Sequence, residues 1–106
     1  MTGYSLVLTT INSEEEAHKL AKTLVQSRLA ACVTIIPNVT SVYNWKDQLQ
    51  QDREFVLLIK THSSLAPALQ DHFERNHPYE VPEFIVIGIE RGSDAYLGWM
   101  ANWLIK

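Results

Sequence analysis

Two uninterrupted apolar runs, FVLLI at residues 55–59 and FIVIGI at residues 84–89, limit how this chain can fold more than any other feature. Successive side chains of a β-strand point to opposite faces, so a sheet that contains both runs needs burial on both faces. Two helices would cover one face. The other face would be covered by a C-terminal helix in a monomer, by a second subunit, or by both. We expect an oligomer, because assemblies of identical chains commonly bury such surfaces.

The order of the other patterns predicts a single α+β domain that spans residues 1–106. The predicted elements are strand 4–11, helix 13–28, strand 30–45, strand 54–62, helix 63–76, strand 84–90 and a last helix, 93–106. This βαββαβ order, with an extra C-terminal helix, is the split βαβ or ferredoxin-like sandwich. Ser13 has the spacing of a cap for the first helix, and Ser63 or Ser64 for the second.

The two central strands predict a long β-hairpin. Its arms, residues 30–45 and 54–62, exceed the usual strand length of about 5–6 residues, and the polar segment KDQLQQDR turns the chain between them. Pro37 lacks a backbone N–H, which predicts a bulge or bend in the first arm. A hairpin this long projects past its own domain, and pairing with a neighbouring subunit would protect its edges.

Charge, hydropathy and cysteine content exclude several classes of partner. The formal net charge is −3 and no basic stripe is present, so we expect no nucleic-acid partner. No apolar run approaches the roughly 20 residues that a membrane helix needs, so we expect no membrane partner. The N-terminus lacks the basic region of a signal peptide, and Cys32 is the single cysteine, which indicates a cytoplasmic protein.

The segment NHPYEVPEF combines a histidine, a tyrosine and two glutamates with two prolines. Each proline restricts the residue before it to extended conformations, so the segment is stiff. His77 could ligate a borderline metal, and Glu83 could add a carboxylate. Alternatively, His77 ends the second helix, where a partly charged imidazole meets the negative end of the helix dipole. The residues alone leave both interpretations open.

Cys32 and Lys60 are the other residues with possible chemistry. A strand cysteine is usually a small apolar residue, but its thiolate could ligate copper beside a histidine and a carboxylate. Lys60 either extends its ammonium to solvent or places a charge in a cleft. The sequence has no G-x-S-x-G, glycine-rich phosphate loop or H-E-x-x-H. A nucleophile–base pair of Cys32 and His77 would need a lowered thiol pKa, so we expect no enzyme.

Four motifs in register, RLAACVTIIPNVTSVYNW, EFVLLIKT, HPYEVPE and GSDAYLGWM, resemble the CutA family of divalent-cation tolerance proteins over nearly the whole chain. The resemblance implies a ferredoxin-like fold and a homotrimer built by the long hairpin and the C-terminal segment. It also implies a role in tolerance to divalent metal ions, copper above all, with copper or another divalent cation as the bound ion. It implies no established catalytic reaction.

The resemblance also assigns site residues. By position, Cys32, His77 and Glu83 match a metal-ligand set, whereas Trp45, Lys60 and Tyr79 match residues of clefts between subunits. The chain departs from the family pattern at three places: a threonine where some members carry a first-strand cysteine, Asn38 in place of a glycine, and Asn44 in place of an aromatic residue. Asparagine tolerates a left-handed backbone, so the turn at Asn38 survives.

Three other functions compete with metal binding. One is a small-molecule sensor whose clefts between subunits hold an organic anion near Lys60 and Tyr79. This hypothesis rests on analogy with other proteins of the same fold. Another is a structural trimer with an indirect metal phenotype. The last is a small hydrolase that depends on Cys32.

Overall fold

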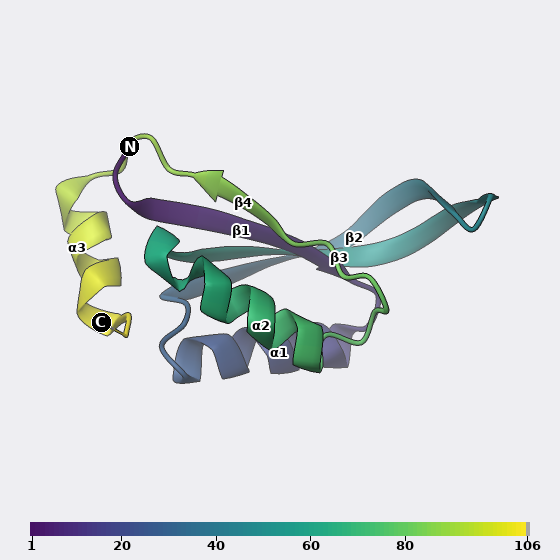
Figure 1. Ribbon diagram of the computed structural model, residues 1–106, viewed down its shortest axis with the longest axis horizontal. Helices are drawn as coiled ribbons and strands as arrows, with labels where there is room; N and C mark the ends of the chain where they lie inside the picture. Colours follow the sequence, from purple (N-terminus) through teal and green to yellow (C-terminus); the bar gives the residue numbers. More distant parts are fainter. Residues whose placement is uncertain (106) are drawn as a thin grey trace.

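One four-stranded antiparallel sheet and three helices make up the protein, in a computed structural model that describes residues 1–105 (Figure 1). The elements in chain order are β1 (Tyr4–Ile11), α1 (Glu14–Gln26), β2 (Cys32–Trp45), β3 (Gln48–His62), a 3₁₀ turn (Ser63–Leu65), α2 (Ala66–Asn76), β4 (Ile85–Gly88) and α3 (Asp94–Trp103). The strand order is β2-β3-β1-β4, and each neighbouring pair is antiparallel. The α+β class and the element order are as the sequence predicts.

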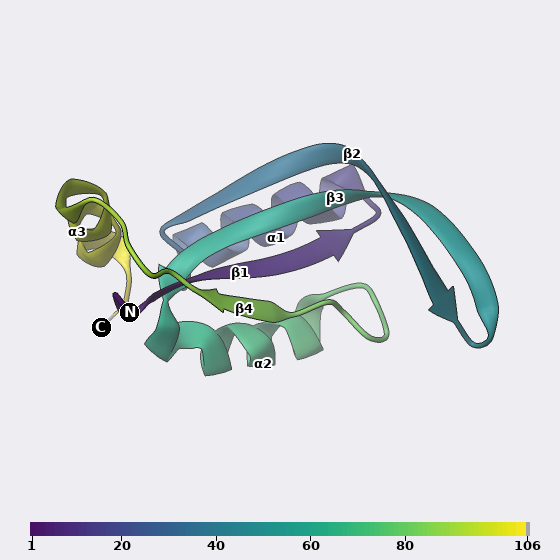
Figure 2. The same ribbon diagram turned by 90° about the horizontal axis from the view of Figure 1, so that it is seen from above.

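Helices α1 and α2 cover the same face of the sheet (Figures 1 and 2). Burial alternates along β1, and its buried positions include Val7 and Ile11, which pack in one cluster with Leu24 of α1 and Phe73 of α2. Helix α1 begins as predicted, because the Ser13 Oγ accepts a hydrogen bond from the Glu16 N–H at 3.2 Å. The sheet thus presents its even-numbered β1 residues on the face away from these helices.

That second face is not covered by α3, which lies past the end of the sheet beside the N-terminus (Figures 1 and 2). The Trp103 Nε1–H donates to the Val25 carbonyl oxygen at 2.7 Å and so fixes α3 to the end of α1. Met100 of α3 is buried, but Tyr96 and Trp99 on the same helix are exposed. Within one chain, the last helix therefore buries little of that face.

The hairpin of β2 and β3 extends well away from the helices (Figure 1). Its second arm, β3, is longer than predicted, whereas β2 begins at Cys32, two residues later than predicted. Its turn consists of Lys46 and Asp47 alone, both with positive φ, as in the tight turns that match the twist of a hairpin. The predicted loop KDQLQQDR is therefore wrong, and β3 starts at Gln48. The predicted irregularity at Pro37 is confirmed: the β2–β3 register shifts there, and Asn38 has a φ of 58°.

Two further predictions need correction. The last strand is only Ile85–Gly88, since the chain leaves the edge of β1 after four residues. The serines do not cap α2; the His62 side chain accepts from the Ser64 N–H before the 3₁₀ turn, and α2 follows without a side-chain cap. Among residues 1–105, no helix has the length and apolar character needed to cross a membrane.

Candidate functional site

A cleft of about 700 Å³ lies between the hairpin, the end of β1 and the loop that joins α2 to β4, here called loop 77–84. The lining residues of this hairpin cleft are Thr10, Asn12, Ser41, Val42, Tyr43, Trp45, Asp52, Glu54, Tyr79, Glu80, Val81, Pro82 and Glu83. Four of them carry carboxyl groups, and none is a lysine or an arginine. The cleft is therefore acidic, with aromatic side chains in its walls.

His77 anchors loop 77–84 to the sheet. It ends α2, and its ring is largely buried. The Nδ1 atom accepts a hydrogen bond from the Tyr79 N–H at 3.1 Å, which places the ring proton on Nε2. Nε2 then donates to the Thr10 carbonyl oxygen at 3.1 Å. Burial lowers the pKa of His77, although the Thr10 contact and the charge of Glu54 oppose this effect. The imidazole is thus a neutral structural group with both nitrogens engaged.

Tyr79 connects the loop to the hairpin. Its Oη donates a hydrogen bond of 2.5 Å to Oε2 of Glu54 on β3. Glu54 is only 4% exposed as a residue, so this bond compensates a buried carboxylate. Burial raises the pKa of Tyr79 well above its ordinary value, and the hydrogen bond to Glu54 raises it further. The phenol therefore stays protonated and available as a donor.

Glu83 faces the same cleft from the far end of the loop. Burial raises the pKa of its carboxyl group, and the negative charge of Glu54 raises it further. Two carboxyl groups that share a partly buried space repel each other when both are ionised. A cation bound between them would reduce this repulsion.

The hairpin supplies the opposite wall. The Tyr43 Oη donates to an Asp52 carboxylate oxygen across the β2–β3 pair. This hydrogen bond is the main reason that the pKa of Tyr43 is raised. Trp45 lies near the hairpin turn and is 38% exposed, with the Lys46 Nζ over its ring at 5.6 Å from the centroid. The wall therefore combines aromatic faces with an additional carboxylate.

Cys32 and Lys60 lie elsewhere on the sheet. They are cross-strand partners, and the Lys60 Nζ lies 3.7 Å from Cys32 Sγ and 3.1 Å from Thr34 Oγ1. Lys60 pairs with Leu6 of β1, whereas the cleft begins at Thr10. Four residues along a strand correspond to roughly 13 Å. The lysine and the thiol therefore form a separate pair at the other end of β1.

The structure thus divides the residues that the sequence singled out. Glu83, Trp45 and Tyr79 line the hairpin cleft, His77 supports it, and Cys32 and Lys60 lie apart from it. Within residues 1–105, no three His, Cys, Asp or Glu side chains are grouped closely enough to hold a metal ion.

Sequence reasoning missed the acidic wall of the cleft. Asp52 and Glu54 occupy alternate positions of one strand and so project from the same side of it. This alternation is a signal of a polar strand face, but the predicted loop KDQLQQDR includes Asp52 and so hides it. Glu54 gains its importance only from the contact with Tyr79, which is distant in sequence.

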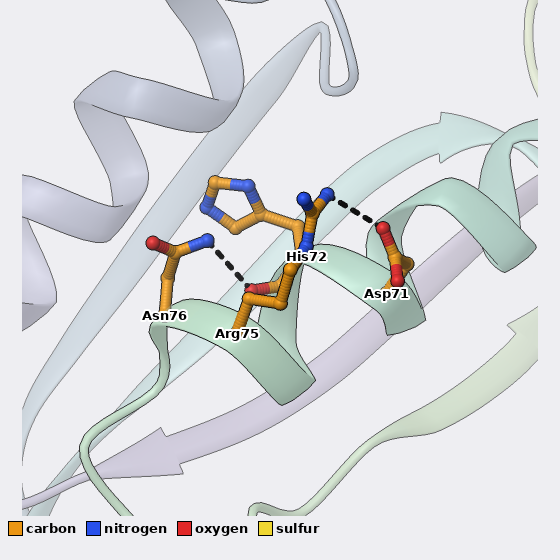
Figure 3. Close-up of polar contacts among 4 residues, drawn as sticks. All are labelled: Asp71, His72, Arg75 and Asn76. Carbon is orange, nitrogen blue, oxygen red and sulfur yellow. Dashed lines mark hydrogen bonds and ion pairs between the residues drawn. The ribbon is translucent and has the colours of Figure 1, made fainter.

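A second polar group lies on the outer surface of α2 (Figure 3). Arg75 and Asp71 form an ion pair of 2.6 Å, and Asn76 Nδ2 donates to the His72 carbonyl oxygen at 3.0 Å. These are contacts within one helix between residues four apart, and exposed pairs of this kind contribute only about 0.3–0.5 kcal/mol. Asp71, Arg75 and Asn76 lie on the solvated face of α2, whereas the His72 side chain is half-buried.

The sequence matches the profile of the family described as "CutA1 divalent ion tolerance protein" over residues 5–103. The chain belongs to the CutA1 family. It is 44% identical to the divalent-cation tolerance protein CutA of Thermus thermophilus, over 90% of this chain and 92% of that protein.

Other CutA1 relatives agree with this assignment. The chain is 46% identical to the chloroplastic protein CutA of Arabidopsis thaliana over 92% of its own length, but it spans about half (53%) of that relative. The crystal structure of CutA1 from Oryza sativa superposes with a TM-score of 0.94 at 39% identity, and the match covers 100% of this chain and 99% of that one. The fold described above is thus that of solved CutA1 proteins.

Proposed function

We propose that this chain serves divalent-cation tolerance by binding the cation in the hairpin cleft, as a cytoplasmic homotrimer that catalyses no reaction. The observation that carries the proposal is the pairing of Glu54 and Glu83 across one partly buried space. Carboxylate oxygens are good ligands for divalent ions, and a bound dication would offset the repulsion between the two groups.

The donor set indicates which ion and redox state fit best. The cleft offers oxygen ligands, and Cys32, the single thiol, lies outside it. Among divalent first-row ions Cu²⁺ forms the strongest complexes with a given set of such ligands, whereas Cu⁺ prefers sulfur. Copper would therefore bind here as Cu²⁺. His77 would join the site only by giving up its hydrogen bond from Tyr79, so we assign it a supporting role.

The remaining ligands would come from water or from a neighbouring copy of the chain. Several surfaces support an assembly: β4 exposes Ile85, Val86 and Ile87, and α3 exposes Tyr96 and Trp99. Unpaired edges and aromatic patches of this kind are typical of interfaces.

The number of subunits, three, follows the resemblance to CutA trimers. The strand order β2-β3-β1-β4 fits a ferredoxin-like chain. Light scattering tests this number: a mass of three subunits supports the trimer, and a single-chain mass contradicts it.

Binding without turnover agrees with the separation of the reactive groups. The His77 nitrogens contact Thr10 and Tyr79, while Cys32 contacts Lys60, so a nucleophile–base pair does not form between them. A hydrolase activity lost in Cys32→Ala would contradict this part of the proposal.

Calorimetric titration with Cu²⁺ tests the cation site. We expect wild type to bind stoichiometrically and Glu83→Gln to bind at least about tenfold more weakly, since a charged ligand is lost. Glu74→Gln is the matched control, because Glu74 is an exposed glutamate on α2 outside the cleft. Cys32→Ser should bind like wild type. Equal affinity in Glu83→Gln and Glu74→Gln would contradict the site, and a loss confined to Cys32→Ser would move it to the Lys60 end of the sheet.

A further inference from the structure

A thiol and an amine lie in contact on the sheet, outside the hairpin cleft. Cys32 of β2 and Lys60 of β3 are cross-strand partners, and the Lys60 Nζ lies 3.7 Å from the Cys32 Sγ. Lys60 also pairs with Leu6 of β1, so the two groups lie on the sheet face away from α1 and α2. Both residues are half-buried, which leaves the sulfur accessible to a molecule little larger than water.

The backbone holds the two side chains next to each other. They are opposed in an unbroken part of the β2–β3 register. The Ala31 N–H donates to the Lys60 carbonyl oxygen at 2.9 Å, and the Thr61 Oγ1 donates to the Leu29 carbonyl oxygen at 2.7 Å. Directly opposed Cβ atoms of neighbouring strands are only about 4.5–5.5 Å apart. The thiol and the amine therefore start from fixed, adjacent positions.

The surroundings of Lys60 direct its amine toward the sulfur. On the β1 side its neighbour is Leu6, whose side chain has no polar atom. On the β2 side the Lys60 Nζ lies 3.1 Å from Thr34 Oγ1, and this hydroxyl lies 3.9 Å from the Cys32 Sγ. Among residues 1–105, no carboxylate forms an ion pair with Lys60. The thiol and the hydroxyl are thus the side-chain partners of this amine within the described chain.

This arrangement limits what oxidation of the thiol can produce. Oxidation gives a sulfenic acid, which condenses with a thiol to a disulfide or with a nitrogen to a sulfenamide. Cys32 is the single cysteine, so a disulfide within one chain is excluded. The nitrogen in contact with the sulfur is that of Lys60.

The reaction balances with hydrogen peroxide as the oxidant. In the first step the O–O bond breaks, the sulfur is oxidised, and the products are the sulfenic acid and water. In the second step the deprotonated Lys60 amine attacks the sulfur with its lone pair. The S–N bond forms, the S–O bond breaks, and the oxygen leaves as water with the sulfenic acid proton and one amine proton.

We propose that Cys32 and Lys60 form a redox-sensitive modification site, in which hydrogen peroxide oxidises the thiol and the lysine amine closes a covalent sulfenamide bond between β2 and β3. A thiol reductant reverses the bond: it attacks the sulfur and displaces the amine, and a second thiol then releases Cys32 as the disulfide of the reductant forms. The chain therefore carries a reversible response to peroxide that does not depend on the cation site.

Mass spectrometry of the full chain tests this site, in buffer with a chelator so that metal plays no part. After treatment with hydrogen peroxide the chain should lose about 2 Da, and digestion should give peptides joined at Cys32 and Lys60. Dithiothreitol should restore the original mass, and on a denaturing gel the oxidised protein should migrate as a single chain. Added oxygen without joined peptides, or a disulfide between two chains, would overturn the proposal.

A substitution of Lys60 separates its nucleophilicity from its charge. In Lys60→Arg the positive charge stays beside the thiol, but the guanidinium stays protonated and cannot attack the sulfur. We expect no joined peptides in this variant, and at least about tenfold more trapping of the Cys32 sulfenic acid by dimedone than in wild type. Lys22→Arg, at an exposed position of α1, is the matched control and should behave like wild type. Equal trapping in wild type and Lys60→Arg would overturn the proposal.

Discussion

Tyr79 and Glu54, 25 residues apart in sequence, join loop 77–84 to the hairpin through a hydrogen bond of 2.5 Å. The contact compensates a carboxylate that is nearly inaccessible to solvent and sets the floor of the cleft. It also closes a chain of contacts, because the Tyr79 N–H is held by His77, and His77 is held by Thr10 of β1. The candidate cation ligand Glu83 belongs to the same loop.

Removal of the Tyr79 hydroxyl should destabilise the protein. Tyr79→Phe leaves the buried Glu54 carboxylate without its donor, and hydrogen bonds to charged groups contribute about 1.5–3 kcal/mol. We expect a lower melting temperature, measured by circular dichroism, with a much smaller loss for Tyr96→Phe on the exposed surface of α3. In Glu54→Gln the same Tyr79→Phe change should cost less, since no buried charge remains. If Tyr79→Phe lowers the stability equally in the wild-type protein and in Glu54→Gln, the hydrogen bond to the charged carboxylate does not contribute more than an ordinary hydrogen bond.

Acid should destabilise the protein through His77. Its pKa in the folded state lies below the ordinary value of 6.5, so the unfolded chain binds more protons as the pH falls below that value. Stability that is present above pH 6.5 is therefore lost on acidification. His72, whose pKa is lowered mainly by burial, acts in the same direction. We therefore expect the melting temperature to fall less steeply between neutral and mildly acidic pH in His77→Gln and in His72→Gln than in wild type. If the pH dependence of the melting temperature is unchanged in His77→Gln, the buried imidazole is not neutral in the folded state.

Replacement of Glu83 should stabilise the metal-free protein near neutral pH. The pKa of Glu83 in the folded state is raised above its ordinary value of 4.5. The protonated carboxyl group therefore favours the folded state below pH 4.5. This stabilisation is lost as the pH rises through the folded-state pKa. Glu83→Gln removes the unfavourable charge, for a gain of at most about 0.5 kcal/mol. The gain should disappear in acid, where wild type is protonated as well. A loss of stability at neutral pH would indicate that Glu83 makes a favourable contact in the assembly.

The local backbone at Asn38 gives a prediction that is independent of the site. Its φ of 58° lies in the left-handed region, beside the shift in β2–β3 register. Asn38→Ala should cost about 1 kcal/mol, because a Cβ without a compensating polar contact is strained there. Asn38→Gly is the matched control and should be neutral or stabilising. Chemical denaturation of both variants measures the difference, and an equal cost would rule out backbone strain.

Features with local causes were predictable from the sequence. The first strand, the Ser13 cap, the irregularity at Pro37 and the tolerance of Asn38 for positive φ each depend on a few adjacent residues. The hairpin turn was missed, because Lys46 and Asp47 adopt positive φ without glycine. The four motifs quoted above were sufficient for the family assignment, which the comparisons confirm.

The site was less predictable, because it depends on contacts between distant segments. The burial of Glu54 arises from the path of loop 77–84, which no local pattern encodes. Likewise, the position of Lys60 beside Cys32 follows from the β2–β3 register. The alternative hypothesis of an organic anion near Lys60 and Tyr79 therefore joined two residues that lie in different parts of the fold, because Lys60 pairs with Cys32 and only Tyr79 lines the cleft.

The most direct test of the account is native mass spectrometry of the purified protein during a Cu²⁺ titration, with wild type, Glu83→Gln and Glu74→Gln compared at equal concentration. The account predicts a trimeric mass for all three proteins. It predicts one Cu²⁺ per subunit in wild type and Glu74→Gln, and a marked loss of bound ion in Glu83→Gln. A trimer that takes up copper in scattered amounts independent of Glu83 would contradict the cation site in the hairpin cleft, and a monomer would contradict the assembly.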